Sequence, residues 1–316
     1  MSDAAVLLCG HGSRDPEAIR EFEILASAMR ARLPGRVVEH GFLEFARPTI
    51  GEVLERLRVA GAREVHALPG MLFAAGHAKN DIPSVLNNFT ATHPEITIRY
   101  GRELAIDPLM LKAARERIET AERTASSRHS RADSLLLVVG RGTTDPDANS
   151  NVAKVARLLV EGLGYGWGEA AFSGVAHPRT DAAIARALRL DFKRIVVFPY
   201  FLFTGVLVKR IYEAADEAIR AQTGVEIVKA PYLNDHPWVV QAFHDRLDEI
   251  TQGANLMNCQ LCKYRVQIIG YEDDLGAPQA GHHHHVEGIG TDADRHQQDH
   301  DHHHDHPPHA APRRGK

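Results

Sequence analysis

Three residues able to bind a metal ion or take up a proton recur at an even spacing near the start of the chain. The interval from His11 to Glu44 equals that from Glu44 to His77, and each residue follows a mostly apolar segment. Two imidazoles and one carboxylate suit a borderline divalent ion such as cobalt, nickel, iron or zinc. An imidazole also accepts protons near neutral pH. We therefore expect these residues to form one site for a metal ion or for proton transfer.

The segments around these residues predict the elements that would bring them together. Residues 6–10 and 64–69 are nearly continuous apolar runs, as in buried strands of a parallel sheet. Residues 50–57 have the pattern of an amphipathic helix. In open parallel sheets, ligands bind beyond the carboxyl ends of the strands. Successive strand–helix units would thus deliver one residue each to a common edge.

The chain contains an internal repeat with one constant offset, which indicates a duplicated domain. Its matching pairs of segments are 7–16 with 137–146, 47–49 with 177–179, and 64–73 with 194–203. A fourth pair, 104–108 with 233–237, has slipped by one residue. Each copy reads as alternating strands and helices, so we predict an α/β protein with two tandem, doubly wound parallel-sheet domains.

The repeat and the changes in composition predict the domain boundaries. The expected divisions are an N-terminal domain over residues 1–123, a polar linker over 124–133, a C-terminal domain over 134–252, and an extension over 253–316.

The second copy lacks all three candidate site residues. The offset pairs His11 with Arg141, Glu44 with Gly174, and His77 with Leu207. Singly, the first-copy residues could be a helix cap, a solvated carboxylate and a hydrogen-bonded surface histidine. Their joint replacement favours an active site that the molecule needs only once. We expect that site in the first domain.

Three motifs carry a resemblance to a known family. The motifs LCGHGSR at residues 8–14, GFLE at 41–44 and PGMLFAAGH at 69–77 resemble those of the class II tetrapyrrole chelatases. With the duplication, the chain looks more closely like the long-form sirohydrochlorin cobaltochelatases, CbiX, over residues 1 to about 250 and into the extension. The resemblance implies flavodoxin-like, chelatase-type domains with the macrocycle between them. It also implies that His11 and His77 bind the incoming cobalt(II) and that Glu44 assists, without ATP. Consistently, the sequence has no GxxxxGK[ST] phosphate loop.

Sirohydrochlorin is a polycarboxylate, so its site should combine cationic groups with apolar walls. The cationic candidates are Arg14, Arg47, Lys79, Arg141, Lys209 and Arg210, and the aromatic candidates are Phe73, Phe201 and Phe203. The alternative is that the phenylalanines belong to the core and that the basic residues are solvated.

The extension contains a CxxC pair, Cys259 and Cys262. Such a pair indicates a metal or redox site, and the family resemblance associates it with an iron–sulfur cluster. Cys9, in a predicted buried strand, is a poor third ligand, so a cluster would be shared within a homodimer or use other ligands. The alternative is an inert or zinc-binding pair.

Eleven of the 20 histidines lie between residues 282 and 309, interleaved with aspartates. This composition predicts a disordered tail that binds cobalt, nickel, copper and zinc with little selectivity. Our hypothesis is that the tail is a metal reservoir for the site.

Other features exclude several classes of function. The net charge of −4 and the absence of a basic stripe argue against a nucleic-acid partner. The apolar runs are too short to span a membrane. The N-terminus resembles no secretion signal, and the three cysteines suit a reduced compartment, so we expect a cytoplasmic protein. The alternatives left open are insertion of ferrous iron for sirohaem, metal storage or delivery, and flavin or nucleotide binding, although no GxGxxG pattern occurs.

Overall fold

The computed structural model describes residues 4–221 and 224–253. Cys259, Cys262 and the histidine-rich segment 282–309 lie outside the described residues, so the predictions made for them stay predictions. No helix in the described part of the chain is long and apolar enough to cross a membrane.

Each half of the molecule alternates strands with helices. The first half runs β1 (Ala5–Gly10), α1 (Pro16–Arg32), β2 (Val38–Phe42), α2 (Ile50–Val59), β3 (Glu64–Pro69), η1 (His77–Asp81), α3 (Ile82–Thr92), β4 (Thr97–Tyr100) and α4 (Pro108–Thr124). The second half runs β5 (Ser134–Gly140), α5 (Pro146–Leu163), β6 (Trp167–Phe172), α6 (Thr180–Ala187), β7 (Arg194–Pro199), α7 (Val206–Arg220), β8 (Glu226–Lys229) and α8 (Pro237–Gln252).

The two sheets have the same topology. Their strand orders are β2-β1-β3-β4 and β6-β5-β7-β8, and every pairing is parallel. In each sheet two central strands lie side by side, β1 with β3 and β5 with β7. The chain leaves these two strands toward opposite edges of the sheet, and doubly wound folds bind ligands at this point. The prediction of two tandem α/β sheets related by duplication is confirmed.

Local sequence signals begin the helices that follow the central strands. Asp15 and Asp145 each accept a hydrogen bond from a backbone N–H of the first turn, of α1 and α5 respectively, and a proline follows each as the first helical residue. Helix α2 begins with a reciprocal capping box between Thr49 and Glu52. These caps fix the loops that leave the carboxyl ends of the strands.

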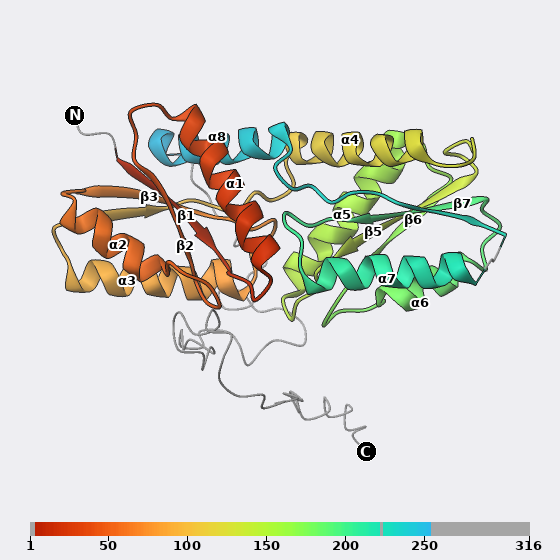
Figure 1. The fold of residues 1–316 in the computed structure, drawn as a ribbon, viewed down its shortest axis with the longest axis horizontal. Helices are drawn as coiled ribbons and strands as arrows, with labels where there is room; N and C mark the ends of the chain where they lie inside the picture. Colours follow the sequence, from red (N-terminus) through yellow and green to blue (C-terminus); the bar gives the residue numbers. More distant parts are fainter. Residues whose placement is uncertain (1–3, 222–223, 254–316) are drawn as a thin grey trace, which may run out of the picture.

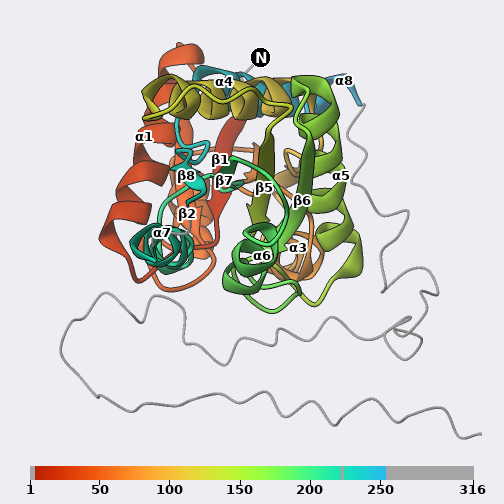
Figure 2. The same cartoon turned by 90° about the vertical axis from the view of Figure 1, so that its right-hand side faces the viewer.

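The last helix of each half covers the sheet of the other half. Helix α8 packs on α1 and β3, whereas α4 packs on α5 and β8, and the two helices also pack against each other. Figure 1 shows α8 beside α1 over the first sheet and α4 over the second sheet, and Figure 2 shows the same layers from the side. Helices α2 and α3 cover the opposite face of the first sheet, and α6 and α7 that of the second.

The hydrophobic core reflects this exchange of helices. One large cluster of buried side chains includes residues of α1, α4, α5 and α8 and so runs through both halves. Two smaller clusters lie under α2 and α3, and under α6 and α7. The division into domains at residues 1–123 and 134–252 stays a prediction. These ranges mark the sequence repeat, but each folded unit takes its last helix from the other range.

Candidate metal site and cavity

His11 is the first residue after β1 and is held by its own backbone turn. Its Nδ1 donates to the carbonyl of Gly12 at 2.8 Å, so the lone pair of the neutral ring is on Nε2. Gly12 has φ of +94°, and a Cβ there would lie 1.7 Å from the carbonyl oxygen of Glu44. Only glycine fits this position, because the loops after β1 and β2 touch here.

Glu44 reaches the same place from the loop after β2. Its backbone N–H donates to the carbonyl of His11 at 3.0 Å, and its buried Oε1 lies 3.1 Å from His11 Nε2. The next residue, Phe45, has φ of +62°, a left-handed conformation uncommon for a bulky side chain. The strained turn is therefore built at the site itself.

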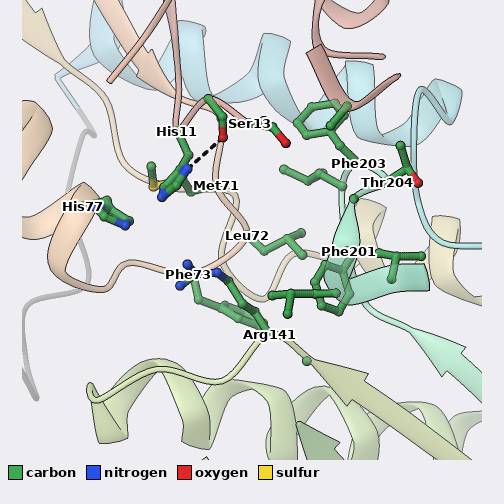
Figure 3. Close-up of a pocket in the computed structure, with 18 of the residues that line it drawn as sticks. His11, Ser13, Met71, Leu72, Phe73, His77, Arg141, Phe201, Phe203 and Thr204 are labelled. Carbon is green, nitrogen blue, oxygen red and sulfur yellow. Dashed lines mark hydrogen bonds between the residues drawn. The ribbon is translucent and has the colours of Figure 1, made fainter. Parts of the chain in front are cut away.

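His77 begins the helix that follows β3. Its ring lies edge-on to the His11 ring, with centroids 4.4 Å apart. Its Nδ1 lies 2.7 Å from Oδ2 of Asp81, one turn further along the helix. Figure 3 shows both imidazoles at one end of the cavity, beside Met71.

The three side chains have the geometry of an open ligand set. One donor atom from each of His11, Glu44 and His77 lies within 4.8 Å of the others. Neighbouring ligands of a tetrahedral or octahedral ion are about 3.0 to 3.4 Å apart when each bond is about 2.1 Å, which fits the 3.1 Å between His11 and Glu44. Three ligands leave coordination positions open to a further molecule, as in catalytic rather than structural sites.

The site opens into a cavity of about 450 Å³ between the two halves, a volume typical of small-molecule sites. His11 and His77 line one end of it, and Arg141 of the second half lies on another wall (Figure 3). Leu207 of the second half also lines the cavity. Arg141 and Leu207 occupy the repeat positions of His11 and His77. The second copy therefore lines the same cavity with an arginine and a leucine where the first copy has two histidines.

The three candidate phenylalanines all line this cavity. Phe73, Phe201 and Phe203 are half-buried, so each combines packing against the core with a face open to the cavity. Phe73 is also stacked on Tyr200, with ring centroids 5.8 Å apart. These walls can stack on a planar apolar ligand.

The candidate cations divide into two groups. Arg14 and Arg141 line the cavity. Part of the Arg141 side chain is open to solvent, yet removal from bulk water lowers the pKa of its guanidinium, while the charge of Glu44 acts the other way. Arg47 instead forms an ion pair with Glu52.

Lys79 also lies outside the cavity lining, contrary to the role expected for it. Its ammonium is buried and forms ion pairs with Asp145 at 2.7 Å and Asp147 at 3.1 Å, both at the start of α5. Burial opposes the charged form, but these two carboxylates more than offset it and raise the pKa of Lys79. Lys209 is paired with Asp15 in the same manner at the surface. Arg210 is exposed.

Two residues near the site were not predicted. Phe45 lines the cavity, its ring lies 5.9 Å from that of His11, and the Arg14 guanidinium stands over it at 5.1 Å. Asp81 is buried behind His77. The available signal for Asp81 was the spacing of four residues within a helix, which places two side chains on one face.

The chain matches one protein family over both of its halves. The CbiX family model covers residues 5–121 and 135–250. The chain is 35% identical to the sirohydrochlorin cobaltochelatase of Priestia megaterium over 269 residues, 85% of this chain and 87% of that protein. It is 30% identical to the sirohydrochlorin ferrochelatase of the same organism over 234 residues, 74% of this chain and 85% of that protein.

A solved structure shows the same architecture. SirB from Bacillus subtilis, determined with Fe3+, superposes with a TM-score of 0.70 at 28% identity, covering 81% of this chain and 99% of that one. The motifs, the duplicated parallel sheets and a family match over both halves agree. The chain belongs to the CbiX family of class II tetrapyrrole chelatases.

Proposed function

We propose that this protein is a sirohydrochlorin cobaltochelatase, which inserts cobalt(II) into the macrocycle without ATP. The observation that carries the proposal is the His11, Glu44 and His77 ligand set at one end of a cavity with aromatic and cationic walls. The family membership supplies the reaction class, and relatives named for sirohydrochlorin supply the substrate.

In this proposal each part of the cavity has a separate task. The phenylalanines Phe73, Phe201 and Phe203 stack on the ring, and Arg14 and Arg141 pair with carboxylates at its edge. The metal ion binds at His11, Glu44 and His77, facing the ring nitrogens. Such charge-assisted pairs each contribute about 1.5 to 3 kcal/mol to binding.

Two of these side chains can take up the protons that the reaction releases. Two pyrrole N–H bonds break, and the ring nitrogens form bonds to the metal, so two protons leave the ring for each ion that enters. As the ion transfers, the Nε2 lone pair of His11 and the carboxylate of Glu44 become free of it. These two groups lie 3.1 Å apart and can act as general bases that pass the protons on to solvent.

The choice of cobalt over iron rests on the extent of similarity to two enzymes of one organism. Identity is 35% to the cobaltochelatase and 30% to the ferrochelatase. The cobaltochelatase match covers 269 residues, more than residues 1–253 contain, so it includes part of the C-terminal extension. The 234-residue ferrochelatase match does not require the extension.

An iron–sulfur cluster at Cys259 and Cys262 stays a prediction, because both lie outside the described residues. Within the described part of the chain, Cys9 is fully buried in β1, and burial raises the pKa of its thiol. Cys9 is therefore unsuited to be a third ligand, since ligation requires the thiolate. A cluster would need ligands from a second chain or from other residue types.

The test is anaerobic absorbance spectroscopy of sirohydrochlorin mixed with cobalt(II), with a parallel iron(II) series. The wild-type protein should accelerate cobalt insertion, and His11→Ala and His77→Ala should each reduce the rate by more than about 100-fold, because each removes a ligand. His93→Ala is the matched control, since His93 lies at the end of α3 and outside the cavity lining; it should retain the wild-type rate.

Each alternative has its own outcome. Faster conversion with iron than with cobalt would assign the protein to sirohaem formation. No acceleration with either metal would reject the chelatase and favour storage or delivery of metal. Equal rates for the wild type and both site variants would place the chemistry elsewhere in the molecule.

A further inference from the structure

The helix that carries His77 begins with a turn that the second half lacks. Residues His77–Asp81 form a π-helical turn, in which the N–H of Ile82 bonds to the carbonyl of His77, five residues back. The corresponding α7, Val206–Arg220, is α-helical throughout. Single π turns inside α-helices occur frequently at functional sites.

The wide turn explains a feature of the internal repeat. Lys79 and Lys209 keep the main offset of the repeat, whereas the interval from Leu104 to Leu233 is shorter by one. The five residues of η1 and the 11 of α3 together exceed the 15 of α7 by one. The first half therefore holds one more residue in this region, and the π turn accommodates it.

The turn places a buried carboxylate behind His77. Asp81 Oδ2 lies 2.7 Å from His77 Nδ1, and the Asp81 side chain is 3% exposed. The side-chain amide of Asn80 donates to the other oxygen, Oδ1, at 3.0 Å. Such hydrogen bonds offset the cost of burying this charge. They also hold the carboxylate in one orientation.

The second half has lost the carboxylate together with the histidine. With the main offset of the repeat, Asp81 corresponds to Ile211. With the offset shorter by one, it corresponds to Arg210, so neither alignment supplies an acid. Leu207 stands in place of His77.

The lysine that lies between His77 and Asp81 in the sequence, unlike those two residues, has an equivalent in the second half. Lys79 is matched by Lys209 in the second half, and both make the same kind of ion pair between the halves. The shared structural contact persists, whereas the His–Asp pair exists only where the metal-site histidine does. The pair therefore belongs to the site and not to the common scaffold.

The hydrogen bond determines which nitrogen of His77 can bind a metal. When Nδ1–H donates to Asp81, the lone pair of the neutral ring is on Nε2. The contact also limits rotation of the ring, so Nε2 has one preferred direction. A carboxylate that accepts from the far nitrogen of a histidine ligand commonly has this effect, and its loss costs 10- to 100-fold in metal affinity or activity.

We propose that Asp81 is a positioning residue, which holds His77 in the tautomer and orientation that present Nε2 to the metal ion. The π turn is then part of the site, because it carries both members of the pair. This inference rests on the proposed metal site at His11, Glu44 and His77. It adds a fourth residue that does not itself touch the ion.

The test measures cobalt(II) binding to the full-length protein without sirohydrochlorin. The signal is the visible absorbance of bound cobalt(II) in each protein minus the absorbance in His77→Ala. Because His77→Ala has the same histidine-rich tail, the subtraction removes the contribution of cobalt bound to the tail. Asp81→Asn keeps the shape and an oxygen acceptor, and Asp81→Ala removes both. Glu116→Ala is the control, because Glu116 is a carboxylate that lies 3.2 Å from a histidine, His236, away from the cavity lining.

We expect Asp81→Asn to weaken cobalt binding by about 10-fold and Asp81→Ala by about 100-fold. Both should also change the shape of the cobalt spectrum, which a purely structural role of Asp81 would leave unaltered. The control should match the wild type in affinity and spectrum. If Asp81→Ala fails to fold, Asp81→Asn still decides the question.

Wild-type affinity and spectrum in the folded Asp81 variants would overturn the inference but leave the metal site intact. If His77→Ala binds cobalt as the wild type does, no difference signal exists. That result would overturn the metal site itself. The two failures are thus distinguishable.

Discussion

Arg141 is the residue of the second half that corresponds to His11, and it faces the metal site from across the cavity. Its charge lies close enough to Glu44 for the two to interact. A guanidinium at this position can pair with a carboxylate at the edge of the macrocycle. The duplicated position would then have changed from binding the metal ion to binding the acidic substrate.

Replacing Arg141 should therefore weaken binding of the tetrapyrrole. For Arg141→Ala we expect the KM for sirohydrochlorin to rise by about 10- to 100-fold, as for the loss of one charge-assisted hydrogen bond. Steady-state kinetics at saturating cobalt measure this change. Arg47→Ala is the control, because Arg47 pairs with Glu52 outside the cavity lining. An equal effect of both substitutions would show that only the overall charge matters.

Among single residues, those whose position follows from strand order alone could be predicted from the sequence. His11, Glu44 and His77 could be found because each follows a strand, and the ends of parallel strands meet. The position of Lys79 could not be found in this way, because the partners that bury it, Asp145 and Asp147, come from the other half. Phe45 was missed because its left-handed backbone leaves no mark on the residue type.

Two of the ion pairs that join the halves are related by the internal repeat. Lys79 at the start of the β3–β4 crossover binds the cap of α5, and Lys209 of α7 binds Asp15, the cap of α1. Their surroundings differ greatly. The Lys79 side chain is 2% exposed, and that of Lys209 is 52% exposed.

This difference in burial predicts unequal contributions to stability. Lys79→Met should lower the free energy of unfolding by about 3 to 5 kcal/mol, because it leaves Asp145 and Asp147 buried without their counter-charge. Lys209→Met should have little measurable effect, since solvent screens an exposed pair. Urea unfolding followed by circular dichroism compares them. Equal losses of unfolding free energy in the two variants would show that burial does not set the contribution of these ion pairs.

At the scale of elements, strands and helices were predictable because each has a periodic pattern and its own caps. The helix predicted over residues 50–57 is α2, Ile50–Val59, with a capping box. The π turn was not predictable, although the repeat offset becomes shorter by one beyond it. One additional residue fits equally well into a loop or a helix, and only the backbone geometry tells which.

The exchange of α4 and α8 makes the two halves depend on each other. Each helix has a buried face that packs on the other half's elements, and both belong to the core cluster that runs through the molecule. A fragment of residues 1–133 would lack α8 and leave α4 uncovered. Since α4 and α8 occupy corresponding positions in the repeat, a second copy of the fragment could supply the missing helix.

We therefore expect the fragment of residues 1–133 to form a folded dimer and no folded monomer. In the dimer, each α4 would cover the sheet of the other copy, which buries the apolar surface that α8 covers in the full chain. Light scattering after size-exclusion chromatography gives the mass, and circular dichroism reports folding. A folded monomer would contradict this account of the core.

The histidine-rich tail allows a prediction that depends on metal supply. Deleting residues 280–316 should slow insertion when free cobalt is scarce and leave the rate unchanged at saturating cobalt, if the tail serves as a reservoir. Insertion rates over a series of buffered cobalt concentrations measure this. Equal loss at all concentrations would contradict the reservoir hypothesis.

The arrangement of the whole molecule was only partly predictable. The repeat indicated two similar sheets, because the same pattern of strands and helices occurs twice. It could not reveal the exchange, since the final helices of the two copies have equivalent patterns and either could cover either sheet. The division at residues 124–133 is therefore a boundary in the sequence and not between independently packed units.

In the proposed reaction the metal ion binds between His11, Glu44 and His77 on its way into the ring. Anomalous X-ray diffraction at the cobalt absorption edge, from crystals of the protein grown with cobalt(II), locates the bound ion. We expect an anomalous peak about 2.0 to 2.2 Å from Nε2 of both histidines and from a carboxylate oxygen of Glu44. A peak at His244, Asp245 and Asp248 of α8, the other described group of potential ligands, with none between His11, Glu44 and His77, would contradict it.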